Sequence, residues 1–83
     1  MKAKQVGAII RVLVSRADVV TFNRSWPCSN LPARPFWFEF WANGDMCDYG
    51  PESVHGKHDG PALLALSNDA QAYAVSRGYL VAR

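Results

Sequence analysis

The sequence lacks the features by which several large classes of protein are recognised. Its 9 basic residues are scattered, and no run of them resembles a stripe that follows phosphates. No apolar stretch approaches the roughly 20 residues that a membrane-spanning helix needs. The apolar stretch after Lys2 and Lys4 is short and is interrupted by Arg11, so no secretory leader is expected. These absences predict a soluble cytoplasmic protein that does not bind membranes.

Cysteine and histidine are scarce as well. Cys28, Cys47, His55 and His58 have the spacing C-x18-C-x7-H-x2-H, which lacks the tight cysteine knuckle of zinc sites. We therefore expect no metal and no cofactor, and we expect both thiols to be reduced, with Cys47 in the core and Cys28 in a loop. A metal site in which these four side chains come together is the lesser alternative.

No pattern in the chain is typical of an enzyme. Cys28 has His55 or His58 as a conceivable base, but no glycine-rich elbow or helix N-terminus presents its thiol. Glu39 and Asp48 could form an acid–base pair, yet a flat sheet face lacks the concavity of most active sites. The prediction is that the protein is not an enzyme, and a small enzyme or metal-binding protein ranks third among the interpretations.

What the sequence does contain is the composition of one small globular domain. The chain has 83 residues, of which 49% are hydrophobic and 19% charged, with a net charge of +2. These values are typical of a folded protein, and the length leaves no room for a second domain. Residues 1–83 are therefore predicted to form a single domain, whose 12% aromatic content helps a small core to bury enough surface.

Alternation and helical spacing predict the first two elements. Residues 6–15 alternate apolar side chains with a period of two, which predicts a strand. Residues 16–26 place Val19, Phe22 and Trp26 at helical spacing after Ser15, a suitable N-cap, so we predict a short helix. A continuing strand is the alternative, because the β-branched residues in this stretch form helices poorly.

A hairpin and a long helix follow a proline-rich loop. Residues 36–42 predict a strand, Asn43-Gly44 a two-residue type I′ turn, and residues 45–49 the returning strand. Residues 61–77 predict the long helix, which Gly78 closes in a left-handed conformation. Whether Tyr79–Arg83 form a short last strand is left open.

These elements predict an α+β fold. A three-stranded antiparallel sheet, with a possible short fourth strand, would carry the short helix and the long C-terminal helix on one face. The strand at residues 36–41 is placed in the middle because it is apolar on both sides. The alternative is a ferredoxin-like β-α-β-β-α-β arrangement, which would place the short, polar strand at 45–49 in the centre of the sheet.

The two-residue turn predicts the register of the hairpin and a contact surface. Phe40 would face Cys47, and Phe38 would face Tyr49, on the core side. The opposite side would carry a candidate binding set made of Trp37, Glu39, Trp41, Met46 and Asp48, with Arg11 from the neighbouring strand. Like charges directly opposite, as at Glu39 and Asp48, destabilise a sheet by up to roughly 1 kcal/mol. Arg11 either merely compensates this pair, or the aromatic and acidic side chains form a docking surface.

Part of the sequence resembles a pattern in small uncharacterised proteins of phages and other mobile elements. The resemblance covers roughly residues 6–75. Its motifs are Phe22-Asn23-Arg24-Ser25-Trp26-Pro27-Cys28-Ser29, Trp37-Phe38-Glu39-Phe40 and Asn43-Gly44-Asp45. The resemblance implies a small, stand-alone accessory protein that acts by binding, and it assigns no chemistry to any residue.

We therefore expect a non-catalytic protein-interaction module that binds a protein partner, or itself as a homodimer, through the aromatic and acidic sheet face. The alternative is a nucleic-acid-binding accessory protein, since aromatic sheet faces stack bases in some RNA-binding folds. Here the aromatic residues surround carboxylates, which repel phosphate, so nucleic acid is the less favoured partner. The identity of the partner, the biological process and the oligomeric state stay open.

Overall fold

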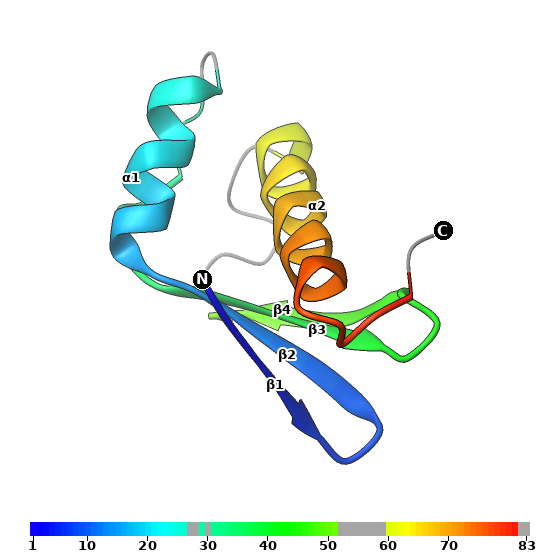
Figure 1. The fold of residues 1–83 in the computed structure, drawn as a ribbon. Coiled ribbons are helices and arrows are strands. Elements are labelled where there is room, and N and C mark those ends of the chain that lie inside the picture. The colour runs from blue at the N-terminus through cyan, green and yellow to red at the C-terminus, as the bar shows by residue number, and fades with distance from the viewer. Residues whose placement is uncertain (27–28, 30, 52–59, 82–83) are drawn as a thin grey trace.

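The computed structural model describes residues 1–26, 29, 31–51 and 60–81, which form four strands and two helices (Figure 1). The elements are β1 (Lys2–Val6), β2 (Ile9–Val14), α1 (Arg16–Ser25), β3 (Phe36–Trp41), β4 (Met46–Gly50) and α2 (Gly60–Ser76). The strands pair antiparallel in the order β1-β2-β3-β4, and both helices lie on one side of the sheet (Figure 1). The α+β prediction is confirmed. The ferredoxin-like alternative is excluded, because β4 lies at the edge of the sheet and not in its centre.

The first hairpin corrects the predicted first strand. Residues 6–15 were expected to form one strand, but Gly7 and Ala8 are a turn that joins β1 to β2, with Val6 paired to Ile9. Gly7 has a φ of 61°, the left-handed conformation that tight hairpin turns require. The fourth strand is therefore β1, and Tyr79–Val81 form no strand. Residues 82 and 83, on which the rest of the predicted last strand falls, lie outside the described residues.

The second hairpin has a different turn from the predicted one. The Gly44 amide donates to the Trp41 carbonyl (2.9 Å), and the Trp41 amide donates to the Asp45 carbonyl (2.8 Å). The loop therefore contains Ala42, Asn43 and Gly44, and Gly44 has a φ of 94°. This is the pattern of a three-residue loop that ends in a left-handed glycine, not of a two-residue type I′ turn.

The longer loop shifts the pairing by one residue, and a β-bulge then restores it. Next to the loop, Phe40 pairs with Met46, where Trp41 was expected to pair with Met46. The register changes between Glu39 and Phe40, which leaves Cys47 as the extra residue of the bulge. Beyond the bulge, Glu39 faces Asp48 and Phe38 faces Tyr49, as predicted. The predicted pairing of Phe40 with Cys47 was wrong.

Both helices have well-defined ends. Ser15 caps α1 through a capping box, in which its hydroxyl accepts from the Asp18 amide and the Asp18 carboxylate accepts from the Ser15 amide. The α2 helix ends in a Schellman motif, because Gly78 has a φ of 80° and the Tyr79 amide donates to the Ala74 carbonyl (2.9 Å). The predictions of a short helix after Ser15 and of a long helix closed by Gly78 are confirmed. Neither described helix is long and apolar enough to cross a membrane.

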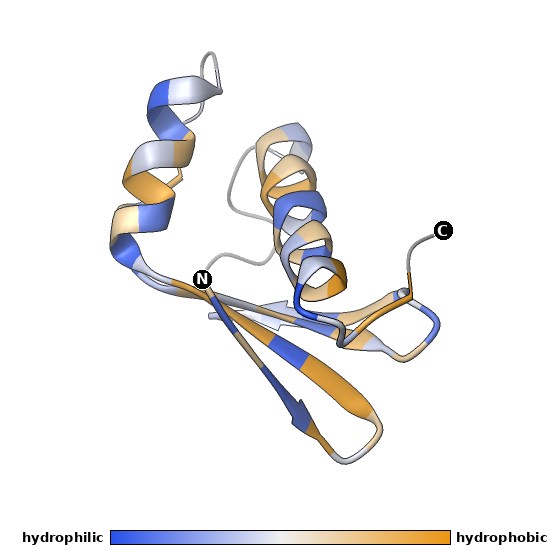
Figure 2. Ribbon diagram, in the orientation of Figure 1, coloured by the Kyte–Doolittle hydropathy of each residue, from blue (hydrophilic) through white to orange (hydrophobic). Residues whose placement is uncertain are grey.

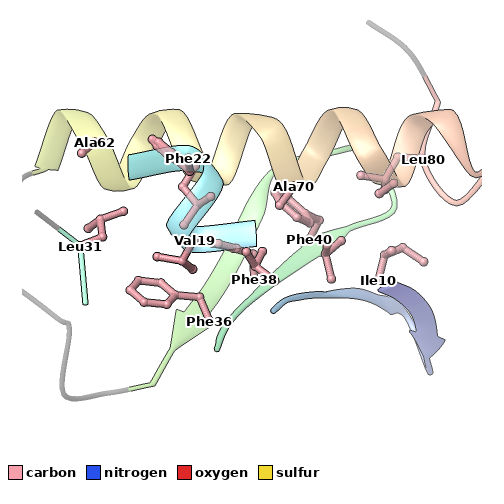
Figure 3. Packing of buried hydrophobic residues seen from close by; sticks show 14 residues of the cluster. Ile10, Val19, Phe22, Leu31, Phe36, Phe38, Phe40, Ala62, Ala70 and Leu80 are labelled. Atoms are coloured by element: carbon pink, nitrogen blue, oxygen red, sulfur yellow. The ribbon is translucent and has the colours of Figure 1, made fainter. Parts of the chain in front are cut away.

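The core lies between the sheet and the helices (Figure 3). Phe36, Phe38 and Phe40 project from β3 beneath α2, and each is almost fully buried. The α2 helix meets them largely with small side chains, such as Ala62 and Ala70, so its backbone can lie close to the large rings. Full burial of each such aromatic side chain stabilises the fold by about 1.5–3 kcal/mol.

Asp18 links the start of the chain to α1. Its carboxylate lies 2.8 Å from the amino group of Met1, and it also accepts from Ser15. The hydrogen bond from the Met1 amino group is the main cause that lowers the pKa of Asp18; partial burial opposes it, and the bonds with Ser15 reinforce it. The ionised form of Asp18 is therefore the form that stabilises the folded protein.

Replacing Asp18 by Asn should lower the free energy of unfolding by about 1 kcal/mol at neutral pH, since the ion pair with the Met1 amino group is lost and a neutral amide oxygen accepts from Ser15 more weakly than a carboxylate. A lowered pKa means that this stabilisation is present above the ordinary pKa of an aspartate and disappears as the pH falls through the folded value. Urea titrations of both proteins should therefore converge under acidic conditions. A difference that is constant with pH would contradict this role.

Candidate docking surface on the open sheet face

The side of the sheet that faces away from the helices is the candidate site. Side chains alternate along each strand, so the residues between the buried phenylalanines of β3 point to this side. Within residues 1–26, 31–51 and 60–81, no helix lies over it (Figure 1). We call this side the outer face, and its members are Lys2, Lys4, Val6, Ile9, Arg11, Leu13, Trp37, Glu39, Trp41 and Asp48.

Strand pairing arranges the outer face in rows that run across the sheet. The middle row, which we call the charged row, consists of Lys4, Arg11, Glu39 and Asp48. One flanking row contains Leu13 and Trp37, and the other contains Val6, Ile9 and Trp41. Figure 2 shows the same pattern along β2, where one hydrophilic block interrupts an otherwise hydrophobic strand. Apart from Lys2, which pairs with Leu13 at the β1 edge, the outer face is therefore apolar at both ends and charged in the middle.

Arg11 lies beside the like-charged pair, as predicted. It pairs with Glu39 across β2 and β3, and Glu39 pairs with Asp48 across β3 and β4. The Arg11 Nε lies 4.0 Å from the nearer Glu39 carboxylate oxygen, which is an ion pair but too long for a hydrogen bond. Because both side chains are partly exposed, this pair contributes at most about 1 kcal/mol. The attraction that Arg11 supplies is therefore of the same order as the repulsion between the two carboxylates.

The two tryptophans of β3 have different surroundings. The Trp37 ring lies over Gly50, where an added Cβ would come within 2.2 Å of the indole carbons. The Arg11 guanidinium stacks on the other side, with its central carbon 4.6 Å from the Trp37 ring centroid, a contact worth about 0.5–1 kcal/mol. Trp41 is 47% exposed. Trp37 is therefore a half-buried structural part of the outer face, whereas Trp41 is free to contact a partner.

Met46 and Cys47 are not where the sequence placed them. Met46 pairs with Phe40 and lines a cavity of about 210 Å³ on the helix side, with Phe38, Tyr49 and Leu63, so it does not belong to the outer face. Cys47 is half-buried and is not part of the core. Burial raises the pKa of the Cys47 thiol, and the carboxylates of Glu39 and Asp48 raise it further. The bulge is the cause of both differences, because it changes the register on one side of Cys47.

The other candidate residues do not add a site. Cys28, His55 and His58 lie outside the described residues, and the part of the chain that the structure describes contains no group of three or more His, Cys, Asp or Glu side chains suited to a metal ion. In the first resemblance motif, Asn23 donates to the Leu31 carbonyl (2.8 Å) and accepts from the Ser29 hydroxyl. These bonds tie Ser29 and Leu31 to α1, so Asn23 and Ser29 have a structural role.

Comparison with protein-family models found no matching family, and searches of curated proteins and of solved structures found no match. The resemblance to proteins of phages and mobile elements therefore stays a prediction.

Sequence reasoning missed two members of this surface. Gly50 matters because it makes room for the Trp37 ring, and Lys4 matters because it completes the charged row. A glycine directly opposite a tryptophan was a readable signal for the first. Lys4 became a member only through the hairpin at Gly7, which folds β1 onto β2.

Replacing Gly50 by Ala should displace Trp37 and lower the free energy of unfolding by about 1–3 kcal/mol, the usual cost of overpacking. The matched control is Gly60→Ala, since nothing lies within 4 Å of a Cβ at that position. Thermal unfolding followed by circular dichroism measures both. Equal stability of the two variants would show that Trp37 does not rest on Gly50.

The position of Cys47 can be tested through its thiol chemistry. In a Cys28→Ser background, replacing Asp48 by Asn should lower the pKa of Cys47 and increase its alkylation rate at neutral pH by about twofold. Asp69→Asn, on α2, is the control and should leave the rate unchanged. Iodoacetamide labelling followed by mass spectrometry gives the rates. An unchanged alkylation rate in the Asp48 variant would show that the carboxylate of Asp48 does not affect the Cys47 thiol.

Proposed function

We propose that this chain is a small non-catalytic protein-interaction module that binds a protein partner, or itself, through the outer face. We further propose, from the resemblance of its motifs, that it is an accessory protein of a phage or mobile element. The observation that carries the first proposal is the exposure of Val6 (51%), Leu13 (41%) and Trp41 (47%) on a sheet face that no described helix covers. Val6 and Trp41 lie in one flanking row and Leu13 in the other, and exposed apolar side chains on one uncovered sheet face are typical of protein-binding surfaces.

The composition of the outer face supports protein binding. Tryptophan and arginine contribute most of the binding energy in many interfaces, and Trp41 and Arg11 supply both types here. The face is also held rigidly, because its strands are anchored on their other side by the buried phenylalanines. A rigid surface loses little conformational entropy on binding. The charged row would then select partners and orient them.

Nucleic acid is the alternative partner, and one observation favours it. Lys2, Lys4 and Arg11 lie on the same face as the two tryptophans, on strands β1 and β2. Glu39 and Asp48 occupy the other half of the charged row, so the row carries no net charge. Phosphate contacts supply most of the affinity for nucleic acids, and this layout provides few of them. Salt-sensitive retardation of single-stranded RNA in a gel would favour this alternative.

The double variant Leu13→Ser and Trp41→Ser should lose partner capture or self-association while it keeps its fold. Both side chains are exposed, so the midpoint of thermal unfolding should change little. Light scattering gives the mass in solution, and a pull-down from host lysate detects a bound protein. Binding weaker by about tenfold or more is expected, because truncation of a tryptophan that anchors an interface typically costs about 2 kcal/mol or more.

The matched control is Leu64→Ser, which changes an apolar side chain that is 59% exposed on α2, on the other side of the sheet. This variant should bind like the wild type. Equal loss in both variants would mean that exposed apolar surface in general causes the association. Unfolding of the double variant would place Leu13 and Trp41 in the core and would end the proposal.

A further inference from the structure

The charged row has an order that a second copy of the chain can complement. From β1 to β4 its members are Lys4, Arg11, Glu39 and Asp48, so both positive charges lie on one half of the outer face and both negative charges on the other. We propose that the outer face binds a second copy of this chain, sheet against sheet, about a two-fold axis that runs parallel to the strands between β2 and β3. This inference rests on the proposed function, because it names the occupant of the same surface.

This axis places opposite charges against each other. A two-fold rotation about a line parallel to the strands reverses their order, so β2 lies over β3 of the second copy and β1 lies over β4. Arg11 then faces Glu39 of the second copy, and Lys4 faces Asp48 of the second copy. Each contact occurs twice by symmetry. The two inner pairs form a ring of alternating charge around the axis.

The same rotation also pairs the apolar rows. In one flanking row Leu13 meets Trp37 of the second copy, and in the other Ile9 meets Trp41 of the second copy. These are contacts between aliphatic and aromatic side chains, the kind that interface cores favour. The exposed apolar surface at both ends of the outer face is thereby covered, while the charges meet in the middle.

The order of charges disfavours a face-to-face dimer whose two-fold axis runs across the strands. A two-fold axis across the strands would place each strand over its own copy, so Arg11 would face Arg11 and Glu39 would face Glu39. Like charges opposite each other in an interface cost several kcal/mol and suppress that mode of association. Two sheets in contact prefer strand directions within about 30° of each other, and because both axes allow this, the charge layout is what distinguishes the two arrangements.

Arg11 has donors to offer to a second carboxylate. The Arg11 side chain is 33% exposed, and its ion pair with Glu39 spans 4.0 Å, too long for a hydrogen bond, so the exposed part of the guanidinium can still donate. A guanidinium has five N–H donors and binds carboxylates best with two parallel hydrogen bonds. Glu39 of the second copy would approach from the open side, since Trp37 stacks on the guanidinium within the chain.

The size of the outer face sets the expected affinity. Four strands at about 4.8 Å spacing give a face about 19 Å wide, and strands of this length are about 17–20 Å long. Two such faces have a flat area of about 700 Å² in total; their accessible surface is larger because side chains corrugate it, on the order of 1,000 Å², which is the low end of specific interfaces. The dimer is therefore expected to dissociate in the micromolar range and to weaken as salt concentration rises.

Two single charge reversals test the orientation. Lys4→Glu and Asp48→Lys both change exposed side chains, and each new charge lies beside an opposite charge of its own chain, so both variants should fold. Sedimentation velocity from about 1 µM to about 1 mM covers the expected range of dissociation constants. Each variant alone should dimerise about tenfold or more weakly than the wild type, because two attractive pairs become repulsive. An equimolar mixture should recover dimers, since both outer pairs are again opposite in sign.

The outcomes separate this inference from the proposed function. Recovery of dimers in the mixture supports the inference. A wild-type dimer that both reversals leave intact would overturn the orientation. A wild type that stays monomeric up to the highest concentration would overturn the second copy as the occupant. In that last case, capture of another protein that Leu13→Ser with Trp41→Ser abolishes and Leu64→Ser preserves would keep the proposed function.

Discussion

The burial of one side of β3 is the constraint on which the rest of this structure depends. Phe36, Phe38 and Phe40 project from alternate positions and fill the space beneath α2. Because successive side chains of a strand point to opposite sides, this packing determines that Trp37, Glu39 and Trp41 point away from the helices. A slip of one residue would bury Glu39 and expose three phenylalanines. The composition of the outer face therefore follows from the packing of the inner one.

The second hairpin shows how local irregularities preserve that constraint. Its three-residue loop shifts the pairing by one residue at Phe40 and Met46. The bulge at Cys47 shifts the pairing back, so that it is restored from Glu39 and Asp48 onwards. The two deviations cancel over the rest of the hairpin. Glu39 still meets Asp48, and Trp37 still meets Gly50, the only kind of residue that leaves room for the indole at that point. Only Met46 and Cys47 take positions that differ from those in a regular two-residue hairpin.

The outer face combines structural contacts and exposed apolar side chains within a small area. Arg11 and Trp37 stack on each other and stabilise the sheet, so they are partly used within the chain. Trp41, Leu13 and Val6 have no comparable cover among the described residues. The charged row between them has no net charge, but its positive charges lie on the β1 side and its negative charges on the β4 side. This charge layout is the reason for proposing a complementary protein surface, and a second copy of the chain in particular, over nucleic acid.

The sequence by itself determined the elements whose signals are local. The period of two in β2 and β3, the serine cap of α1 and the glycine that closes α2 depend on neighbouring residues only, and each of them was predictable. The tertiary structure alone decided that β1 is a strand, because Lys2–Val6 has little apolar pattern and gains its structure from hydrogen bonds to β2. It also decided the bulge at Cys47 and the side on which Met46 lies. Those features depend on register, and register is set by contacts between strands that are distant in the chain or joined by turns of more than one suitable length.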